Sequence, residues 1–191
     1  MRTEPLPDGQ PWWRLVDPGW ADPLDAGYAA ERGARWTPPG GAPTLYLNQD
    51  VPTARANLVR FLAGSSVTPD DLADTSFELV EVVLPDGQTA VDAHSPAGLA
   101  ALGLPATYPL DPAGARIDHA VCQPIGAAVA AAGWDGVHAR SAATAEGRGR
   151  ELAWFPRGRT ATVGGRHRFS RWYFPERAED TGPAAPPPPR R

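Results

Sequence analysis

Short β-rich runs and two segments of helical spacing dominate the pattern of hydrophobic and polar positions. Residues 12–16 run into the turn sequence Asp-Pro-Gly, and residues 44–47 follow a loop rich in Pro and Gly. Both runs are typical of strands bounded by turn residues. The same criteria predict further strands at residues 78–84, 136–140, 150–155 and 167–174.

The first predicted helix spans residues 50–63. Asp50 and Pro52 are typical of a helix start, and Gly64 is typical of a helix end. Apolar residues spaced at i, i+4, i+7 and i+8 predict one buried face, made by Ala54, Leu58, Phe61 and Leu62. Asn57 lies about 60° from Ala54 around the helix axis, so we expect it to border that face.

The second predicted helix spans residues 121–132, with Pro124 in its first turn and Gly133 at its end.

Strands and helices do not alternate regularly along the chain. This order favours an α+β domain, with short, mainly antiparallel strands and flanking helices, over a doubly wound fold.

The two ends of the chain differ from its middle in composition. Residues 1–10 lack an apolar run, and we expect a flexible leader there. Residues 177–191 include four consecutive prolines and cannot bury enough apolar surface to fold, which predicts a disordered tail. The folded domain is therefore predicted over residues 11–176.

Composition excludes several classes of protein. A net charge of −4 and the absence of lysine argue against direct nucleic-acid binding. The chain has no apolar stretch of membrane-spanning length, no signal-peptide pattern and one cysteine, which together favour a cytoplasmic location. All 18 basic residues are arginines, so only arginines at defined structural positions count as evidence for function.

Several common catalytic motifs are missing. The chain contains no phosphate-binding loop of the G-x-x-x-x-G-K type, no G-x-G-x-x-G fingerprint and no G-x-S-x-G nucleophile motif. His119 and Cys122 could form part of a metal site or a nucleophile–base pair, since they are three residues apart on a predicted helix. A buried thiol is the simpler interpretation, and no metal is expected.

The segment from Gly33 to Asn57 carries the best candidates for ligand binding. Pro38 and Pro39 restrict the loop after Arg35, so we expect this guanidinium to be held rigidly, with Trp36 packed beneath it. A fixed guanidinium can bind a phosphate through two hydrogen bonds, and a strand tyrosine such as Tyr46 can stack on a base. From residue types alone, a simpler interpretation is favoured over ligand binding, namely a surface arginine–carboxylate pair beside a core tyrosine.

Four sequence blocks together resemble a known family. They read Trp-Arg-Leu at residues 13–15, Gly-Ala-Arg-Trp-Thr-Pro-Pro-Gly at residues 33–40, Leu-Tyr-Leu at residues 45–47 and Cys-Gln-Pro-Ile-Gly at residues 122–126. In their order and spacing these blocks resemble RES-domain proteins. Looser similarity extends to about residue 156.

The resemblance implies a fold, an activity and a partner. RES domains resemble ADP-ribosyltransferase toxins in fold, and active members cleave the nicotinamide–ribose bond of NAD⁺, with water or phosphate as acceptor. They are typically toxins inhibited by an antitoxin with an Xre-like DNA-binding domain. By this resemblance NAD⁺ is a substrate, contacted by Arg14, Arg35, Trp36, Tyr46 and Gln123, with Arg35, Tyr46 and Asn57 at the reacting bond.

The chain departs from the family pattern at two positions. Asn57 occupies the place of the family's helix glutamate, and Ala120 is the closest equivalent of the serine before the Cys-Gln block. Ser141 lies in a different part of the pattern. An asparagine carries no charge to stabilise an oxocarbenium-like state, so another carboxylate would have to do so. The sequence offers three candidates for this role, Asp50, Asp118 and Glu151.

These departures leave three functions open. The first is a divergent NAD⁺ glycohydrolase or phosphorylase that acts as a toxin. The second is a catalytically weakened module that binds NAD⁺, ADP-ribose or an antitoxin-like partner. The third is a protein ADP-ribosyltransferase. Binding of NAD⁺ depends on the arginines alone and is the better supported expectation.

Overall fold

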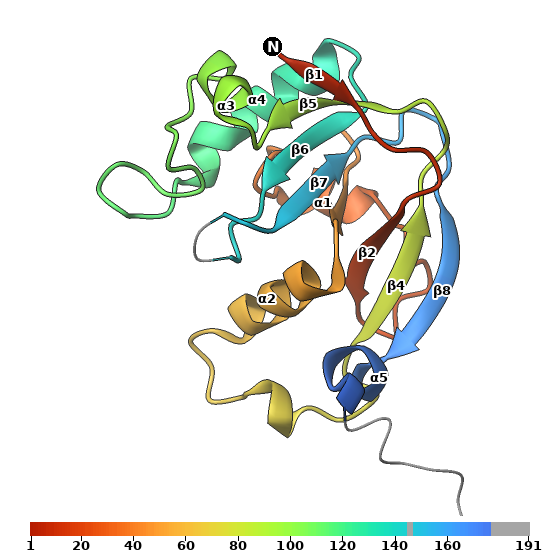
Figure 1. The fold of residues 1–191 in the computed structure, drawn as a ribbon. Helices are drawn as coiled ribbons and strands as arrows, with labels where there is room; N and C mark the ends of the chain where they lie inside the picture. The colour runs from red at the N-terminus through yellow and green to blue at the C-terminus, as the bar shows by residue number, and fades with distance from the viewer. Residues whose placement is uncertain (145–146, 177–191) are drawn as a thin grey trace, which may run out of the picture.

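The computed structural model describes residues 1–144 and 147–176 of the chain, and within them eight strands form one sheet (Figure 1). The spatial order of the strands is β1-β5-β6-β7-β3-β2-β4-β8. Their bounds are β1 Thr3–Pro5, β2 Pro11–Val16, β3 Leu45–Asn48, β4 Glu78–Val83, β5 Thr89–Ala93, β6 Gly136–Arg140, β7 Arg150–Trp154 and β8 Thr162–Arg168.

All neighbouring strands pair antiparallel except β5 and β6, which are parallel. The sheet bends between its β1-β5-β6-β7 half and its β2-β4-β8 half (Figure 1). Strand β3 joins the two halves, because it pairs with β7 over its whole length but with β2 only through Trp13 and Asn48. The expectation of an α+β domain with a mainly antiparallel sheet is confirmed.

Helices cover the sheet and close its bend. Helix α2 lies within the angle between the two halves, and α3 and α4 lie together beside β5 and β6 (Figure 1). The bounds of the helices are α1 Gly27–Arg32, α2 Val51–Leu62, the 3₁₀ turn η1 Pro69–Asp71, α3 Pro96–Ala101, α4 His119–Ala131 and α5 Phe169–Tyr173.

Aspartate caps fix where the two longer helices begin. The Asp50 carboxylate accepts a hydrogen bond from the Thr53 N–H at 2.7 Å at the start of α2, and Asp118 accepts one from the Ala120 N–H at 2.8 Å at the start of α4. Helix α4 therefore begins two residues before the predicted start. Its predicted first-turn proline, Pro124, lies inside the helix.

Three clusters of buried side chains hold these layers together. One packs α3 and α4 on β5, β6 and β7, the second covers the opposite face of the sheet, and the third packs α2 and α5 on the β2–β4 region. Of the predicted face of α2, Ala54 and Leu58 are fully buried, whereas the Phe61 side chain is 71% exposed.

The first ten residues are not a flexible leader. Thr3–Pro5 forms strand β1, which pairs antiparallel with β5, and Leu6 is buried in the core. The prediction was wrong because a three-residue edge strand carries too little periodicity to be recognised from sequence. The predicted Pro-rich tail lies outside the described residues.

The predicted strand at residues 167–174 was also wrong. Strand β8 ends at Arg168, and the aromatic residues that follow form α5. Phe169, Trp172 and Tyr173 are spaced at i, i+3 and i+4, so they present one helical face to the core. Among residues 1–144 and 147–176, no helix is long and apolar enough to cross a bilayer.

Candidate functional site

A cleft opens where α2, β2, β3 and β7 meet. Its central cavity of about 300 Å³ is lined by Leu15, Ala34, Arg35, Tyr46, Leu47, Asn48, Asn57, Arg60, His119 and Glu151. Three further cavities of about 580, 340 and 210 Å³ lie beside it. The 580 Å³ cavity shares Asn57 with the central cavity and Trp20 with the 340 Å³ cavity, which in turn shares Arg14 with the 210 Å³ cavity. The four cavities are therefore neighbours along one cleft.

Arg14 on β2 lines two of the outer cavities and keeps an unused donor. Its Nη2 atom donates to the Asp25 carbonyl oxygen at 3.1 Å, while its buried Nη1 atom has no hydrogen-bond partner among the described residues. Burial lowers the pKa of Arg14 to about 10, against the opposing charges of Asp25 and Asp22. A buried cation with a free N–H group is suited to an anionic ligand.

Arg35 is held rigidly, as predicted, but by different contacts. Its side chain is 5% exposed, and Nη1 donates to the Ile117 carbonyl oxygen at 3.0 Å and lies 3.8 Å from the Cys122 sulfur. These contacts tie the loop before β3 to helix α4. The guanidinium also lines the central cavity, where its positive charge acts on Glu151.

Two of the residues predicted to contact NAD⁺, Trp36 and Gln123, pack behind the side chains that line the cleft. Trp36 is fully buried and packs against the Tyr108 ring, with 5.9 Å between ring centroids. The Gln123 Nε2 atom donates to the Ala34 carbonyl oxygen at 3.1 Å, which holds the loop against α4. Neither residue lines the four cavities, and direct contact with NAD⁺ stays a prediction for both.

Tyr46 contributes its ring to the cleft and its hydroxyl to the protein. The hydroxyl oxygen accepts the Trp36 N–H at 2.8 Å and lies 3.2 Å from the Thr37 hydroxyl. Burial raises the pKa of Tyr46 to about 12, with hydrogen bonds from Thr37 and Trp36 opposing the shift. The hydroxyl is therefore protonated at neutral pH and already hydrogen-bonded, which leaves the ring as the ligand-facing part.

Asn57 lines the central cavity and borders the buried face of α2, where the sequence placed it. Its Nδ2 atom donates to Asn48 Oδ1, and Asn48 Nδ2 donates in turn to the Trp13 carbonyl oxygen at 3.0 Å. Since a carbonyl oxygen can only accept, the Asn48 amide has one orientation, and so has the Asn57 amide. The Asn57 oxygen is left as the atom that can accept from a ligand.

Glu151 is the carboxyl group of the central cavity. It lies on β7 directly opposite Asn48 of β3 in the strand register. Burial raises its pKa, and this is opposed by the charges of Arg35 and Arg60 and by hydrogen bonds from Ser141 and the Ala142 N–H. Of the three candidate carboxylates, Asp50 and Asp118 cap helices, and Glu151 lines the central cavity.

Arg60 was missed by the sequence prediction, whereas His119 and Ser141 were named there but not assigned to this site. Arg60 and His119 line the central cavity, and burial lowers the pKa of both side chains, with nearby Arg35 adding to the shift. Ser141, set aside in the sequence because of its position, is fully buried and hydrogen-bonds Glu151. The i, i+3 spacing of Asn57 and Arg60 on α2 is the one sequence signal that could have linked Arg60 to the site.

His119 and Cys122, which the sequence allowed as a metal-binding or nucleophile–base pair, differ in their exposure to solvent. Cys122 is fully buried, and that burial raises the pKa of its thiol, which Arg35 opposes. His119 is exposed at the cleft. The interpretation of Cys122 as a buried thiol is confirmed.

The fold and the matched sequence together define the class of protein. Residues 11–172 match the RES domain, so the chain belongs to the RES-domain family. In structure it is similar to a chain of the MbcT–MbcA toxin–antitoxin complex of M. tuberculosis, with a TM-score of 0.71, 19% sequence identity and 90% of each chain covered. A comparison with curated proteins found no match. The family recognised from the four sequence blocks is confirmed.

Proposed function

We propose that the cleft binds NAD⁺ and that the protein cleaves its nicotinamide–ribose bond, as a toxin-like RES-domain enzyme. The observation that carries the proposal is the presence of Glu151 in the same cavity as Arg35 and Asn57. Asn57 stands at the family's glutamate position without a charge, and Glu151 supplies a carboxyl group to the cavity from the neighbouring strand.

The cations of the cleft support binding of a diphosphate. Arg35 and Arg60 line the central cavity together with Glu151. Arg14 lines two neighbouring cavities, one of which is also lined by Asp22 and Asp25. Guanidinium groups bind phosphate oxygens through paired, charge-assisted hydrogen bonds. The rings of Tyr46 and Trp20 border the same cavities and offer surfaces on which the nicotinamide and adenine rings can stack.

The proposed reaction breaks the bond between ribose C1′ and the nicotinamide nitrogen. The electron pair of that bond passes to the nitrogen, which becomes neutral, while positive charge grows on the ribose. Ionised Glu151 stabilises this charge. When water attacks C1′, Glu151 accepts the proton that water loses, a task for which a raised pKa is favourable.

Release of nicotinamide from NAD⁺ by purified protein, with and without inorganic phosphate, tests the proposal directly. We expect release above a boiled control, and Glu151→Gln lowers kcat by about 10²- to 10⁴-fold because it removes the charge and the proton acceptor. Glu31→Gln, which changes an exposed glutamate, is the matched control. No nicotinamide above the boiled control would contradict the proposal.

The acceptor distinguishes hydrolysis and phosphorolysis from protein modification. We propose water or phosphate, because these are the acceptors that the family resemblance implies. Incubation of a lysate with NAD⁺ labelled in its adenylate half should therefore leave no labelled protein. A labelled band that depends on Glu151 would assign the protein ADP-ribosyltransferase activity instead.

A protein partner that covers the cleft is a second candidate role. Phe61 is 71% exposed and Trp20 is 41% exposed, and both border the 580 Å³ cavity beside the active cavity. Exposed aromatic side chains at the rim of a site are typical of protein interfaces. We propose an Xre-like antitoxin as this partner. The antitoxin should co-purify with the protein and inhibit nicotinamide release, and Phe61→Ser should abolish the co-purification. A complex that retains full activity would contradict this role.

A further inference from the structure

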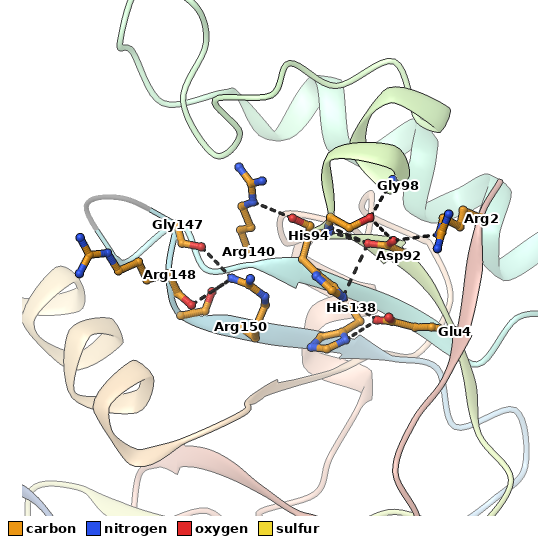
Figure 2. Close-up of polar contacts among 12 residues, drawn as sticks. Arg2, Glu4, Asp92, His94, Gly98, His138, Arg140, Gly147, Arg148 and Arg150 are labelled. Carbon is orange, nitrogen blue, oxygen red and sulfur yellow. Dashed lines mark hydrogen bonds and ion pairs between the residues drawn. The ribbon is translucent and has the colours of Figure 1, made fainter.

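Two histidines and a glutamate from three distant segments meet on the sheet at a distance from the cleft. Glu4 lies on β1, His94 follows β5, and His138 lies on β6 (Figure 2). Glu4 Oε1 is 2.8 Å from His94 Nε2 and 2.6 Å from His138 Nδ1. One potential ligand atom from each residue lies within 4.8 Å of the other two.

We infer that Glu4, His94 and His138 form a Zn²⁺ site that fastens strand β1 to strands β5 and β6. Two imidazole nitrogens and one carboxylate oxygen are a frequent ligand set for zinc, with a fourth position left for water. The presence of two imidazoles disfavours Mg²⁺ and Ca²⁺, which prefer oxygen ligands throughout.

The geometry requires only a small adjustment for a metal. Tetrahedral zinc with bonds of the usual length separates its ligand atoms by about 3.4 Å, so each histidine–glutamate distance must widen by less than about 1 Å. The Glu4 side chain is 29% exposed and lies on an edge strand, so it is free to move by this amount. The distance between the two histidine ligand atoms, which is at most 4.8 Å, must narrow by about 1.4 Å at most. The metal then replaces the two protons that now join the histidines to Glu4.

Surrounding contacts already orient the ligands. The His94 N–H donates to Asp92 Oδ1 at 3.0 Å, and the His94 carbonyl oxygen accepts from Arg140 Nε at 2.8 Å. The same Oδ1 atom of buried Asp92 lies 3.7 Å from His94 Nε2, which favours a cation there.

The nearby arginines are committed to other groups. Arg140 Nη1 donates to the carbonyl oxygens of Ala106 and Tyr108, and Arg150 Nη1 donates to those of three residues in the loop before β7 (Figure 2). Arg2 pairs with Asp92 at 3.5 Å, and its side chain is 63% exposed. Within residues 1–144 and 147–176, the three ligand atoms contact no guanidinium, so a metal would displace protons and not an arginine ion pair.

Titration of tag-free, full-length, chelator-stripped protein with Zn²⁺ tests the site. We expect one Zn²⁺ per chain, a rise in melting temperature on its addition, and the visible absorption of a tetrahedral site when Co²⁺ is used. His94→Ala and His138→Ala should each weaken Zn²⁺ binding by at least about 100-fold, since even loss of a residue that only orients a ligand costs about 10- to 100-fold.

His167→Ala is the matched control, because it removes a half-buried histidine on β8 and should leave the affinity unchanged. Glu4→Gln keeps the size of the side chain and tests the site if a histidine variant fails to fold. Equal Zn²⁺ affinity in the wild type, Glu4→Gln and the histidine variants would overturn the inference, as would binding of less than one Zn²⁺ per chain. Nicotinamide release is measured separately, so either result stands without the other.

Discussion

The side chains of the cleft divide between those that hold its walls and those that offer unpaired polar atoms to a ligand. Tyr46 and Gln123 belong to the first kind, since their polar atoms bind the loop before β3. Arg14 belongs to the second kind through its free Nη1 atom, and Asn57 through its amide oxygen. Substitutions in the two groups should therefore affect different quantities.

Tyr46→Phe should lower the free energy of unfolding by about 1–3 kcal/mol, because the Trp36 N–H loses its acceptor. Urea denaturation followed by tryptophan fluorescence measures this loss. Tyr28→Phe is the control, since the Tyr28 side chain is 60% exposed at the rim of the cleft. Equal stability of the two variants would show that the Tyr46 hydroxyl does not hold the loop.

Arg14→Ala should weaken NAD⁺ binding by about 10- to 100-fold, the usual value of a charge-assisted hydrogen bond, with a smaller effect on kcat. Calorimetric titration with NAD⁺, or with ADP-ribose where NAD⁺ is consumed, gives the dissociation constant. Arg32→Ala removes an arginine whose side chain is 68% exposed and serves as the control. An unchanged dissociation constant in Arg14→Ala would exclude this arginine from the ligand.

Asn57→Asp should destabilise the protein by about 1–3 kcal/mol, because an aspartate oxygen would face the Asn48 oxygen that now accepts from Asn57. Asn48 cannot turn its amide without losing the Trp13 carbonyl oxygen. The double variant Asn48→Ala/Asn57→Asp removes this repulsion, so its loss in stability should be smaller than the sum of the two single losses. Additive losses would contradict the coupling.

Among the elements, α4 and the loop before β3 approach most closely where Gly126 faces Trp36. A Cβ atom at position 126 would overlap the Trp36 carbonyl oxygen, which leaves room for glycine alone. This contact sets the position of α4, and α4 with Ile117 in turn fixes Arg35. One glycine on a helix thus positions a charge in the cleft.

Gly126→Ala should cost about 1–3 kcal/mol or more in stability, because the helix must move away from the loop. It should also lower nicotinamide release through the displacement of Arg35. Ala127→Ser adds one atom at an exposed position of the same helix and is the control. Unchanged stability and activity in Gly126→Ala would show that α4 does not position the arginine.

Elements whose signals are local could be predicted from the sequence. Helix α2 has a capping aspartate and a regular apolar face, and β2 has a turn directly after it. The boundary of β8 and α5 could not be placed, because Gly164 and Gly165 interrupt the strand pattern and an aromatic run follows. Glu151 could be named but not chosen, since its place opposite Asn48 depends on the pairing of two strands about a hundred residues apart.

For the molecule as a whole, the half-buried Glu151 should make stability depend on pH. Its pKa is raised by burial, so the folded state holds this proton more tightly than the unfolded chain does. The stabilisation is complete below the unfolded pKa and is lost as pH rises through the higher folded pKa. Folding with an ionised Glu151 therefore has a cost that a neutral side chain would avoid.

Glu151→Gln should accordingly melt at a higher temperature than the wild type at neutral and higher pH, and the difference should shrink towards pH 4. Melting temperatures measured across this range for both proteins test the sign. Glu31→Gln should show no such dependence of the melting-temperature difference on pH, because the Glu31 side chain is 74% exposed. A wild type that gains stability over Glu151→Gln as pH rises would show that the folded pKa is lowered instead.

The place of β3 in the sheet has a consequence for synthesis on the ribosome. Arg14, Tyr46 and Asn57 emerge early, yet β3 pairs over its full length with β7, which includes Glu151 and leaves the ribosome late. A nascent chain therefore has neither the carboxyl group nor the strand that completes the wall of the cleft. The cleft can close only once translation has passed residue 154, so a shorter nascent chain carries no complete cleft.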